Sequence, residues 1–407
     1  MNARVAVVGS LVAAVAASLL AGLVLTSGLV GDAGISDTVV YGKYGERIAS
    51  GDLPYRDFAV EYPPGALIPF ALPALFSSSQ GRYDDAFEVM MLAALAAVCA
   101  LIVISLRALR TSPARVAFAV ASFLFGTIFL GPFILTRFDL FAAAVALAAI
   151  CALLHRRTVL GPVLLGLAIA TKIYPAVILP LLATQIWKRD GRRAAVRSVG
   201  LVIGTVILAY LPFALLAPEG VIRSVWRQVG RPLQIESLAS SVLLALHHAA
   251  GMPLDWASGS GSQNLTGAVS SVASGITTII GIAALAFVWM RFARGDSENA
   301  ARFVQFAAAA TVAFVTFGKV LSPQFLVWLL AIVVLVQGVR GAIATILLLI
   351  ACLLTRAWFP HSYWDLVKEF DPTASWLVLV RDLVLVALFA VLVVRLRVLR
   401  ARAPGRS

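Results

Sequence analysis

Long runs of apolar residues recur from one end of this 407-residue chain to the other. Apolar residues make up 61% of the sequence and charged residues 13%, whereas soluble domains carry about 25% charged residues. A chain inside a bilayer must satisfy its backbone hydrogen bonds internally, and α-helices do so. The sequence therefore predicts an all-α polytopic membrane protein, formed by one integral membrane domain over residues 1–407.

Interruptions in the apolar runs divide the chain into about twelve expected transmembrane helices. Arg137 and Asp139 break one long run, and Lys172 with Pro175 breaks another. Several of the resulting segments are shorter than the roughly 20 residues that cross a bilayer squarely, so they would have to be broken or buried among neighbours. The first segment is long for a signal-peptide core and lacks a clear cleavage site, so we expect a retained helix. The expected spans are 5–30, 86–106, 116–135, 139–154, 158–171, 174–187, 197–217, 268–290, 303–317, 323–339, 342–355 and 376–395.

The distribution of Lys and Arg sets the expected orientation. An inner N-terminus places most of the basic residues on one side, with only Asp190, Asp296 and Glu298 as acids there. By the positive-inside rule that side is the cytoplasm. The net charge of +13 is then explained by topology and points to no nucleic-acid partner. We expect a multi-pass protein of the cell membrane with both termini cytoplasmic and carboxylate chemistry on the outer face.

Acidic residues gather in the first expected outer loop, residues 31–85. Asp37 lies just beyond the first span, where partial removal from water suits a general base. An Asp before an apolar-periodic segment is also a common N-cap, here of an expected helix over 38–49, and the two roles are compatible. Glu61 is an alternative base. The apolar segment 66–76 is too short and proline-rich to span, which favours an interfacial or re-entrant segment over a simple amphipathic cover.

Several cations are expected near the same face. Lys172 has no acid next to it in the sequence and can bind phosphate as a point charge, with snorkelling to the interface as the alternative. Arg137 is expected to pair locally with Asp139. The second large outer loop, 218–267, carries three arginines spaced four residues apart, which predicts one basic helical stripe that is either solvated or in contact with lipid phosphates. These are Arg223, Arg227 and Arg231.

No metal or cofactor pattern is present in the sequence. The adjacent His247 and His248 diverge on a helix and cannot share a metal. An Asp-x-Asp pair, which often holds the metal-bound diphosphate of a nucleotide sugar, is missing from the sequence. A donor available outside the membrane would be lipid-linked. The three cysteines are expected to be apolar packing residues. They are Cys99, Cys151 and Cys352.

Four sequence blocks, taken in order, resemble those of glycosyltransferase family 87, the polyprenyl-phosphate-mannose-dependent membrane mannosyltransferases of the GT-C fold. They are D-x-x-V-Y at Asp37–Tyr41, G-D-x-P-Y…E-Y-P-P at 51–64, T-K-x-Y-P at 171–175 and L-S-P-Q-F-L-x-W at 321–328. The segment Gln234–Leu238 is also similar. The resemblance covers the chain from about residue 31 to residue 330.

This resemblance implies transfer of a sugar, usually mannose, from a polyprenyl-phosphate donor to a lipid or glycan acceptor on the outer face. Asp37 matches the family's catalytic base. Lys172 with the arginines at 223, 227 and 231 would hold the donor phosphate. Because phosphate is already a good leaving group, the transfer requires no metal. Three aromatic residues are candidates for sugar or lipid contact, with anchoring at the membrane interface as the alternative. They are Tyr41, Tyr62 and Trp328. A lipid or small-molecule transporter is the competing function, although the two halves show no internal repeat.

Overall fold

A computed structural model describes residues 3–77 and 79–394. The described chain is mostly helical, with a single two-stranded hairpin, which confirms an all-α membrane protein. Within this part, seven helices are long and apolar enough to cross a membrane, against twelve expected spans. The seven are α1 (Ala3–Thr26), α4 (Gln80–Ala108), α5 (Pro113–Leu130), α9 (Arg192–Leu216), α12 (Ala268–Ala293), α15 (Gly338–Trp358) and α17 (Pro372–Val393).

The other five expected spans also contain helices, but these are short, so the count of twelve is not confirmed. They are α6 (Asp139–Leu154), α7 (Leu160–Thr171), α8 (Leu179–Asp190), α13 (Ala300–Thr316) and α14 (Phe325–Val333). All nine residues of α14 are buried among neighbouring helices. Short 3-10 turns stand at both expected interruptions, η2 (Pro132–Thr136) before α6 and η3 (Tyr174–Ile178) between α7 and α8. Each turn has a proline in its first positions, where the missing N–H costs no helical hydrogen bond.

The loop 31–85 is folded rather than extended. It forms α2 (Thr38–Ala49), the turn η1 (Pro64–Ala66) and α3 (Leu67–Ala74), and the predicted helix over 38–49 is thereby confirmed. Gly45 allows α2 to lie against α3, because a Cβ there would collide with the carbonyl oxygen of Phe70. On α3, Ile68 and Leu72 stay exposed, as on a segment that rests against lipid.

The loop 218–267 contains α10 (Pro218–Val229), α11 (Leu238–Ala250) and the antiparallel strands β1 (Asp255–Gly259) and β2 (Ser262–Thr266). A further short helix, α16 (Tyr363–Glu369), precedes α17. The expected three-arginine stripe is wrong in part, since α10 ends at Val229 and Gly230 follows it, so Arg231 lies outside the helix.

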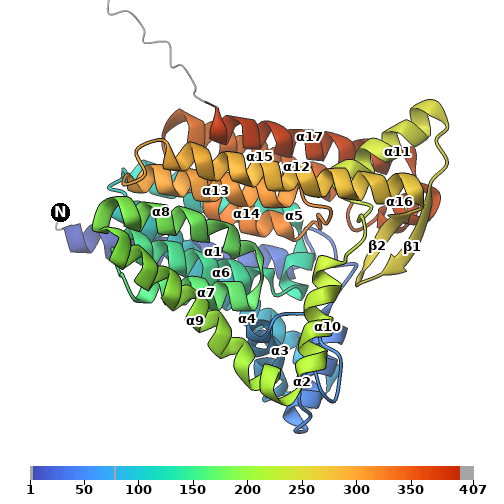
Figure 1. The fold of residues 1–407 in the computed structure, drawn as a ribbon, viewed down its shortest axis with the longest axis horizontal. Helices are drawn as coiled ribbons and strands as arrows, with labels where there is room; N and C mark the ends of the chain where they lie inside the picture. The colour runs from blue at the N-terminus through green and yellow to red at the C-terminus, as the bar shows by residue number, and fades with distance from the viewer. Residues whose placement is uncertain (1–2, 78, 395–407) are drawn as a thin grey trace, which may run out of the picture.

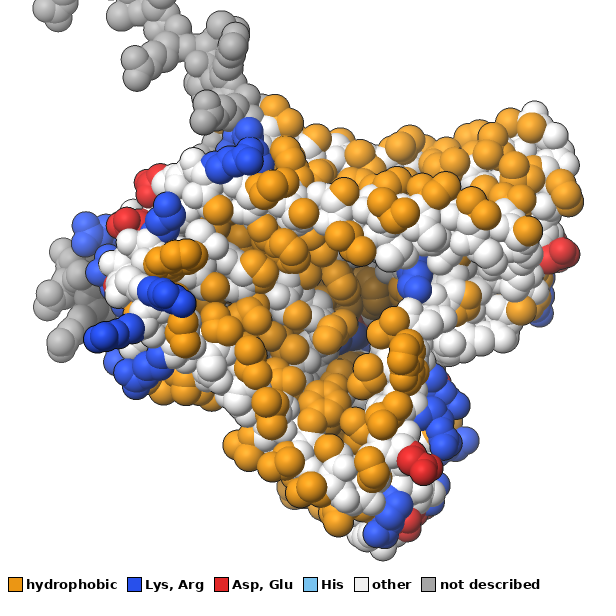
Figure 2. Space-filling model, viewed as in Figure 1, with side chains coloured by type: hydrophobic (Ala, Val, Ile, Leu, Met, Phe, Trp, Pro, Cys, Tyr) orange, Lys and Arg blue, Asp and Glu red, His pale blue; other side chains and the backbone are white. Residues whose placement is uncertain are grey.

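Many basic side chains gather at one end of the molecule. Figure 1 places the N-terminus and the end of α8 at the left, and α2, α3, α10 and the hairpin at the lower and right side. Figure 2 shows Lys and Arg side chains gathered at the left end and a broad apolar surface over the helices between. The three cysteines are buried and unpaired, as expected for packing residues. A concentration of basic side chains on one side is the pattern from which the sequence predicts a cytoplasmic face, and the orientation stays a prediction.

Candidate active site

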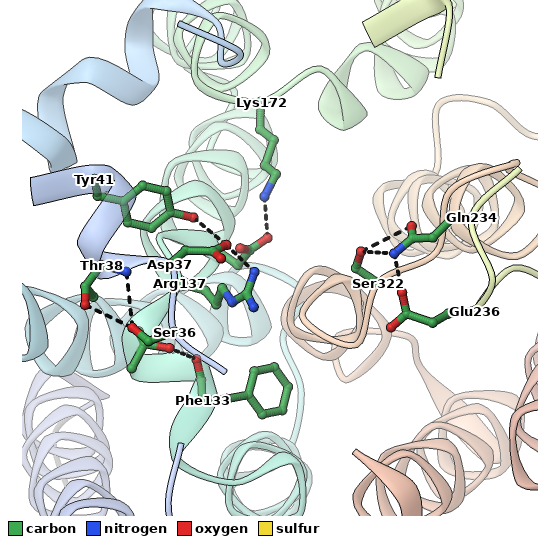
Figure 3. A network of polar contacts seen from close by, with 12 residues as sticks. Ser36, Asp37, Thr38, Tyr41, Phe133, Arg137, Lys172, Gln234, Glu236 and Ser322 are labelled. Carbon is green, nitrogen blue, oxygen red and sulfur yellow. Dashed lines mark hydrogen bonds and ion pairs between the residues drawn. The ribbon is translucent and has the colours of Figure 1, made fainter. Parts of the chain in front are cut away.

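Asp37 is held by an arginine from a distant part of the chain. Nη1 of Arg137 donates to Oδ2 of Asp37, and the Tyr41 hydroxyl donates to the same oxygen at 3.2 Å (Figure 3). Asp37 occupies the N-cap position of α2 but makes no side-chain cap hydrogen bond. The expected local pair between Arg137 and Asp139 is therefore wrong. Arg137 has an extended backbone, whereas Asp139 begins α6, so the two side chains find different partners.

Asp139 instead neutralises Lys172. Nζ of Lys172 donates to Oδ1 of Asp139 at 2.6 Å, and Nε1 of Trp328 donates to the same oxygen at 2.7 Å. The ammonium also lies 4.3 Å from the ring centroid of Phe138 and 4.8 Å from that of Trp328, within cation–π range. Asp139 is 1% exposed and Lys172 16%. Lys172 therefore has a buried acidic partner that its sequence neighbours do not reveal.

The three aromatic candidates lie in different surroundings. Tyr41 is buried and stacks on Phe70 at 4.3 Å between centroids. Trp328 is buried and stacks with Tyr174 at 4.2 Å and with Phe325 at 4.0 Å. Neither ring offers an open face for a sugar, which favours a packing role for both. Tyr62 keeps part of its surface exposed and lies edge-on to Tyr41, so it remains the available aromatic contact.

A second polar cluster faces the Asp37–Arg137 pair. Figure 3 shows Gln234, Glu236 and Ser322 across a gap from Asp37, Arg137 and Lys172. Nε2 of Gln234 donates to the Glu236 carboxylate and also to Ser322 Oγ at 2.9 Å. Arg381 Nη2 donates to the Glu236 carbonyl oxygen at 2.8 Å. Burial raises the pKa of Glu236 to about 7, against the opposing positive charge of Arg381. Besides Asp37, the site therefore contains the carboxyl group of Glu236, whose pKa is about 7.

The raised pKa of Glu236 predicts a pH dependence of stability. In the unfolded chain this carboxyl ionises around its ordinary pKa of 4.5, while the folded protein keeps it protonated up to about 7. The folded state then binds more protons, so stability falls as pH rises from roughly 4.5 to 7 and levels off above that range. Glu236→Gln is expected to flatten this slope in thermal unfolding of the detergent-purified protein. An unchanged slope in Glu236→Gln, with a normal melting transition, would assign the dependence to other groups.

The three arginines of the second loop have different partners. Arg223 is exposed on α10. Arg227 pairs with Glu61 at 3.5 Å, and Gln228 donates to the Glu61 carbonyl oxygen at 2.6 Å, so Glu61 is tied to α10. Arg231 is half-buried, and within the described residues it makes neither a hydrogen bond nor an ion pair. Burial lowers the pKa of Arg231, and the charges of Glu61 and Glu236 oppose that effect. An unpaired guanidinium with two carboxylates nearby is the cation most available to a bound anion.

The family model of glycosyltransferase family 87 matches residues 60–323, more than half of the chain. The chain belongs to glycosyltransferase family 87. A search of curated proteins returns no match. Membership of family 87, together with the long apolar helices, makes this a multi-pass membrane enzyme that acts on a sugar donor and an acceptor. The matched residues include Glu61, Lys172 and the arginines but begin after Asp37, so family 87 membership alone assigns no role to Asp37.

Two acidic residues near this family 87 site, Glu236 and Asp382, were not predicted as site residues from the sequence. Glu236 lies in the Gln234–Leu238 segment but was not singled out. Arg381 and Asp382 form a fully buried ion pair at 2.7 Å in α17, and Arg381 holds the backbone of Glu236. A signal was present, because adjacent charges inside an apolar run are costly and mark functional or structural contacts.

Proposed function

We propose that the protein transfers mannose from a polyprenyl-phosphate donor to a hydroxyl group of a lipid or glycan acceptor on the outer face of the cell membrane. The observation that carries the proposal is the Asp37 carboxylate of a family 87 enzyme, held by Arg137 and Tyr41. The unpaired guanidinium of Arg231 and the Asp37 carboxylate both lie near Tyr62. A base and a phosphate-binding cation are the two groups that this transfer requires.

In the proposed reaction, Asp37 accepts the proton of the acceptor hydroxyl as that oxygen attacks the anomeric carbon. The bond between the anomeric carbon and the phosphate oxygen breaks, and polyprenyl phosphate leaves with the bonding electron pair. One displacement inverts the anomeric centre. Arg137 and Tyr41 fix the direction of the carboxylate, because both donate to the same one of its oxygens and leave the other for the acceptor.

The leaving phosphate is assigned mainly to Arg231. Lys172 is neutralised by Asp139, Arg227 is paired with Glu61 and Arg223 is exposed on α10, which leaves Arg231 as the best placed of the four expected cations. Figure 2 shows a hollow in the apolar surface between α10 and the α12–α13 pair, with Lys or Arg atoms inside it. Such a hollow supports a donor whose chain stays in the lipid while its phosphate reaches the site. The loop 31–85 then acts as the outer catalytic segment.

Donor class is tested with purified protein in lipid nanodiscs. Radiolabelled polyprenyl-phosphate mannose, polyprenyl-phosphate glucose and a nucleotide mannose are supplied in parallel, with a membrane lipid extract as acceptor. We expect labelled product from polyprenyl-phosphate mannose. Product from the nucleotide sugar alone would contradict the proposal, and a preference for the glucose donor would correct the sugar. Transfer in vesicles of known orientation, with acceptor added on one side only, tests the outer-face placement.

Removal of the Arg231 charge is expected to weaken donor binding. Arg231→Gln should raise the KM for the polyprenyl-phosphate donor about tenfold or more, because a hydrogen bond to a charged group contributes about 1.5–3 kcal/mol. The acceptor KM should change little. Arg223→Gln removes the same charge from an exposed position on α10 and serves as the matched control. Equal donor KM values in the two variants would remove Arg231 from the phosphate site.

A further inference from the structure

A basic pocket lies at the opposite end of the molecule from Asp37, where three segments meet. Arg156 and Thr158 come from the turn between α6 and α7, Arg189 from the end of α8, and Arg197 and Ser198 from the first turns of α9. This end carries the gathered Lys and Arg side chains of Figure 2. The pocket shares no residue with the candidate active site.

The charge in this pocket is only partly neutralised. Asp190 also lines it, but its carboxylate is engaged by Arg189, with contacts of 2.9 Å and 2.6 Å. The guanidinium groups of Arg156 and Arg197 make neither a hydrogen bond nor an ion pair with any residue of the described ranges, although the charge of Arg156 acts on Asp190 from a longer distance. Two cations from different segments therefore converge on a pocket in which the one lining carboxylate, that of Asp190, is already bound by Arg189. The hydroxyl groups of Thr158 and Ser198 add hydrogen-bond donors beside them.

The helix α9, which contributes Arg197 and Ser198 to this pocket, has an apolar outer surface. Beyond Arg197, α9 exposes Ile203, Ile207 and Leu208, and Figure 1 shows α9 along the outside of the helix bundle. Trp187, at the end of α8, is 62% exposed, as expected for an aromatic ring at a membrane interface. A ligand that fits both parts has an anionic head group and apolar chains.

We propose that this pocket binds the phosphate of an anionic glycerophospholipid. The lipid belongs to the membrane leaflet at this end of the molecule, and its acyl chains lie along α9. Basic pockets between membrane helices attract anionic head groups, and each Lys or Arg near an anionic surface contributes about 1 kcal/mol. A soluble phosphate compound would gain nothing from the exposed face of α9. The lipid would hold α7, α8 and α9 together at this end, at a distance from the reacting groups.

The test is native mass spectrometry of the purified full-length protein titrated with phosphatidylglycerol, with phosphatidylcholine of the same acyl chains in a parallel series. The pocket variant is Arg156→Gln with Arg197→Gln. The matched control is Arg110→Gln with Arg294→Gln, which removes two exposed arginines outside the pocket; Arg110 and Arg156 share a left-handed backbone with φ of 55°. We expect the wild type to prefer phosphatidylglycerol over phosphatidylcholine. The pocket variant should bind phosphatidylglycerol at least about tenfold more weakly, and the control variant should bind it as tightly as the wild type does.

Three results would overturn this assignment. They are equal binding of the two lipids, equal loss in the pocket and control variants, and displacement of bound phosphatidylglycerol by soluble glycerol 3-phosphate, which would point to a free-phosphate site. Arg156→Lys with Arg197→Lys preserves both charges and should retain most of the lipid binding. Loss of binding in this lysine variant, with its melting temperature unchanged, would also contradict a site built on charge.

Discussion

Asp37→Asn is expected to lower sugar transfer by at least about 10²-fold, the usual loss when a general base is removed. Asparagine has nearly the same shape as aspartate and can still accept the hydrogen bond from Tyr41, but it cannot take the proton of the acceptor hydroxyl. The loss should appear in kcat more than in the donor KM, because Arg231 and not Asp37 is assigned to the phosphate. Initial rates with radiolabelled polyprenyl-phosphate mannose measure both quantities.

Two matched variants make this result specific to Asp37. Asp32→Asn removes a carboxylate from the same loop, outside the candidate site, and should leave transfer unchanged. Glu61→Gln tests the alternative base. The carboxylate of Glu61 is paired with Arg227, so we expect a modest effect through the position of α10. Full transfer in Asp37→Asn combined with a loss in Glu61→Gln would move the base to Glu61. Donor binding retained by Asp37→Asn would exclude unfolding as the cause of its loss.

The order of helices could be predicted because it depends on local information. Apolar runs and their interruptions are read directly from the sequence, so the breaks at Arg137–Asp139 and at Lys172–Pro175 were found, and so was the helix over 38–49. The lengths of the helices were harder to predict from the sequence than their order. Because α14 has nine residues and all of them are buried, its apolar composition alone does not distinguish packing inside the protein from a crossing of the bilayer.

The partners of the charged residues could not be predicted, because they are set by tertiary structure. Asp37 and Arg137 are 100 residues apart, and Lys172 and Asp139 are 33 apart. A prediction from adjacent residues in the sequence therefore paired Arg137 with the wrong acidic residue and found no acidic partner for Lys172. The hairpin β1–β2 was missed for a different reason. Its strands, DWASG and SQNLT, have little of the apolar alternation that marks a strand.

Asp139→Asn is expected to destabilise the protein by about 3–5 kcal/mol, the typical cost of leaving one member of a buried ion pair without its partner. The amide can still accept from Nε1 of Trp328, but the ammonium of Lys172 loses its counter-charge where it is 16% exposed. Lys172→Met should be comparably destabilising, since it leaves the Asp139 carboxylate buried and uncompensated. Thermal unfolding of both variants in the same detergent measures these losses.

The double variant Asp139→Asn with Lys172→Met decides what Lys172 does. It removes both charges and keeps an acceptor for Trp328, so much of the lost stability should return, and the coupling energy follows from the double-mutant cycle. If Lys172 only positions α7 against α6, transfer should return together with stability. A double variant that folds normally but shows a strongly raised donor KM would instead make Lys172 a phosphate ligand, with Asp139 holding it in place. Because Arg231 is assigned the phosphate here, we expect transfer to return.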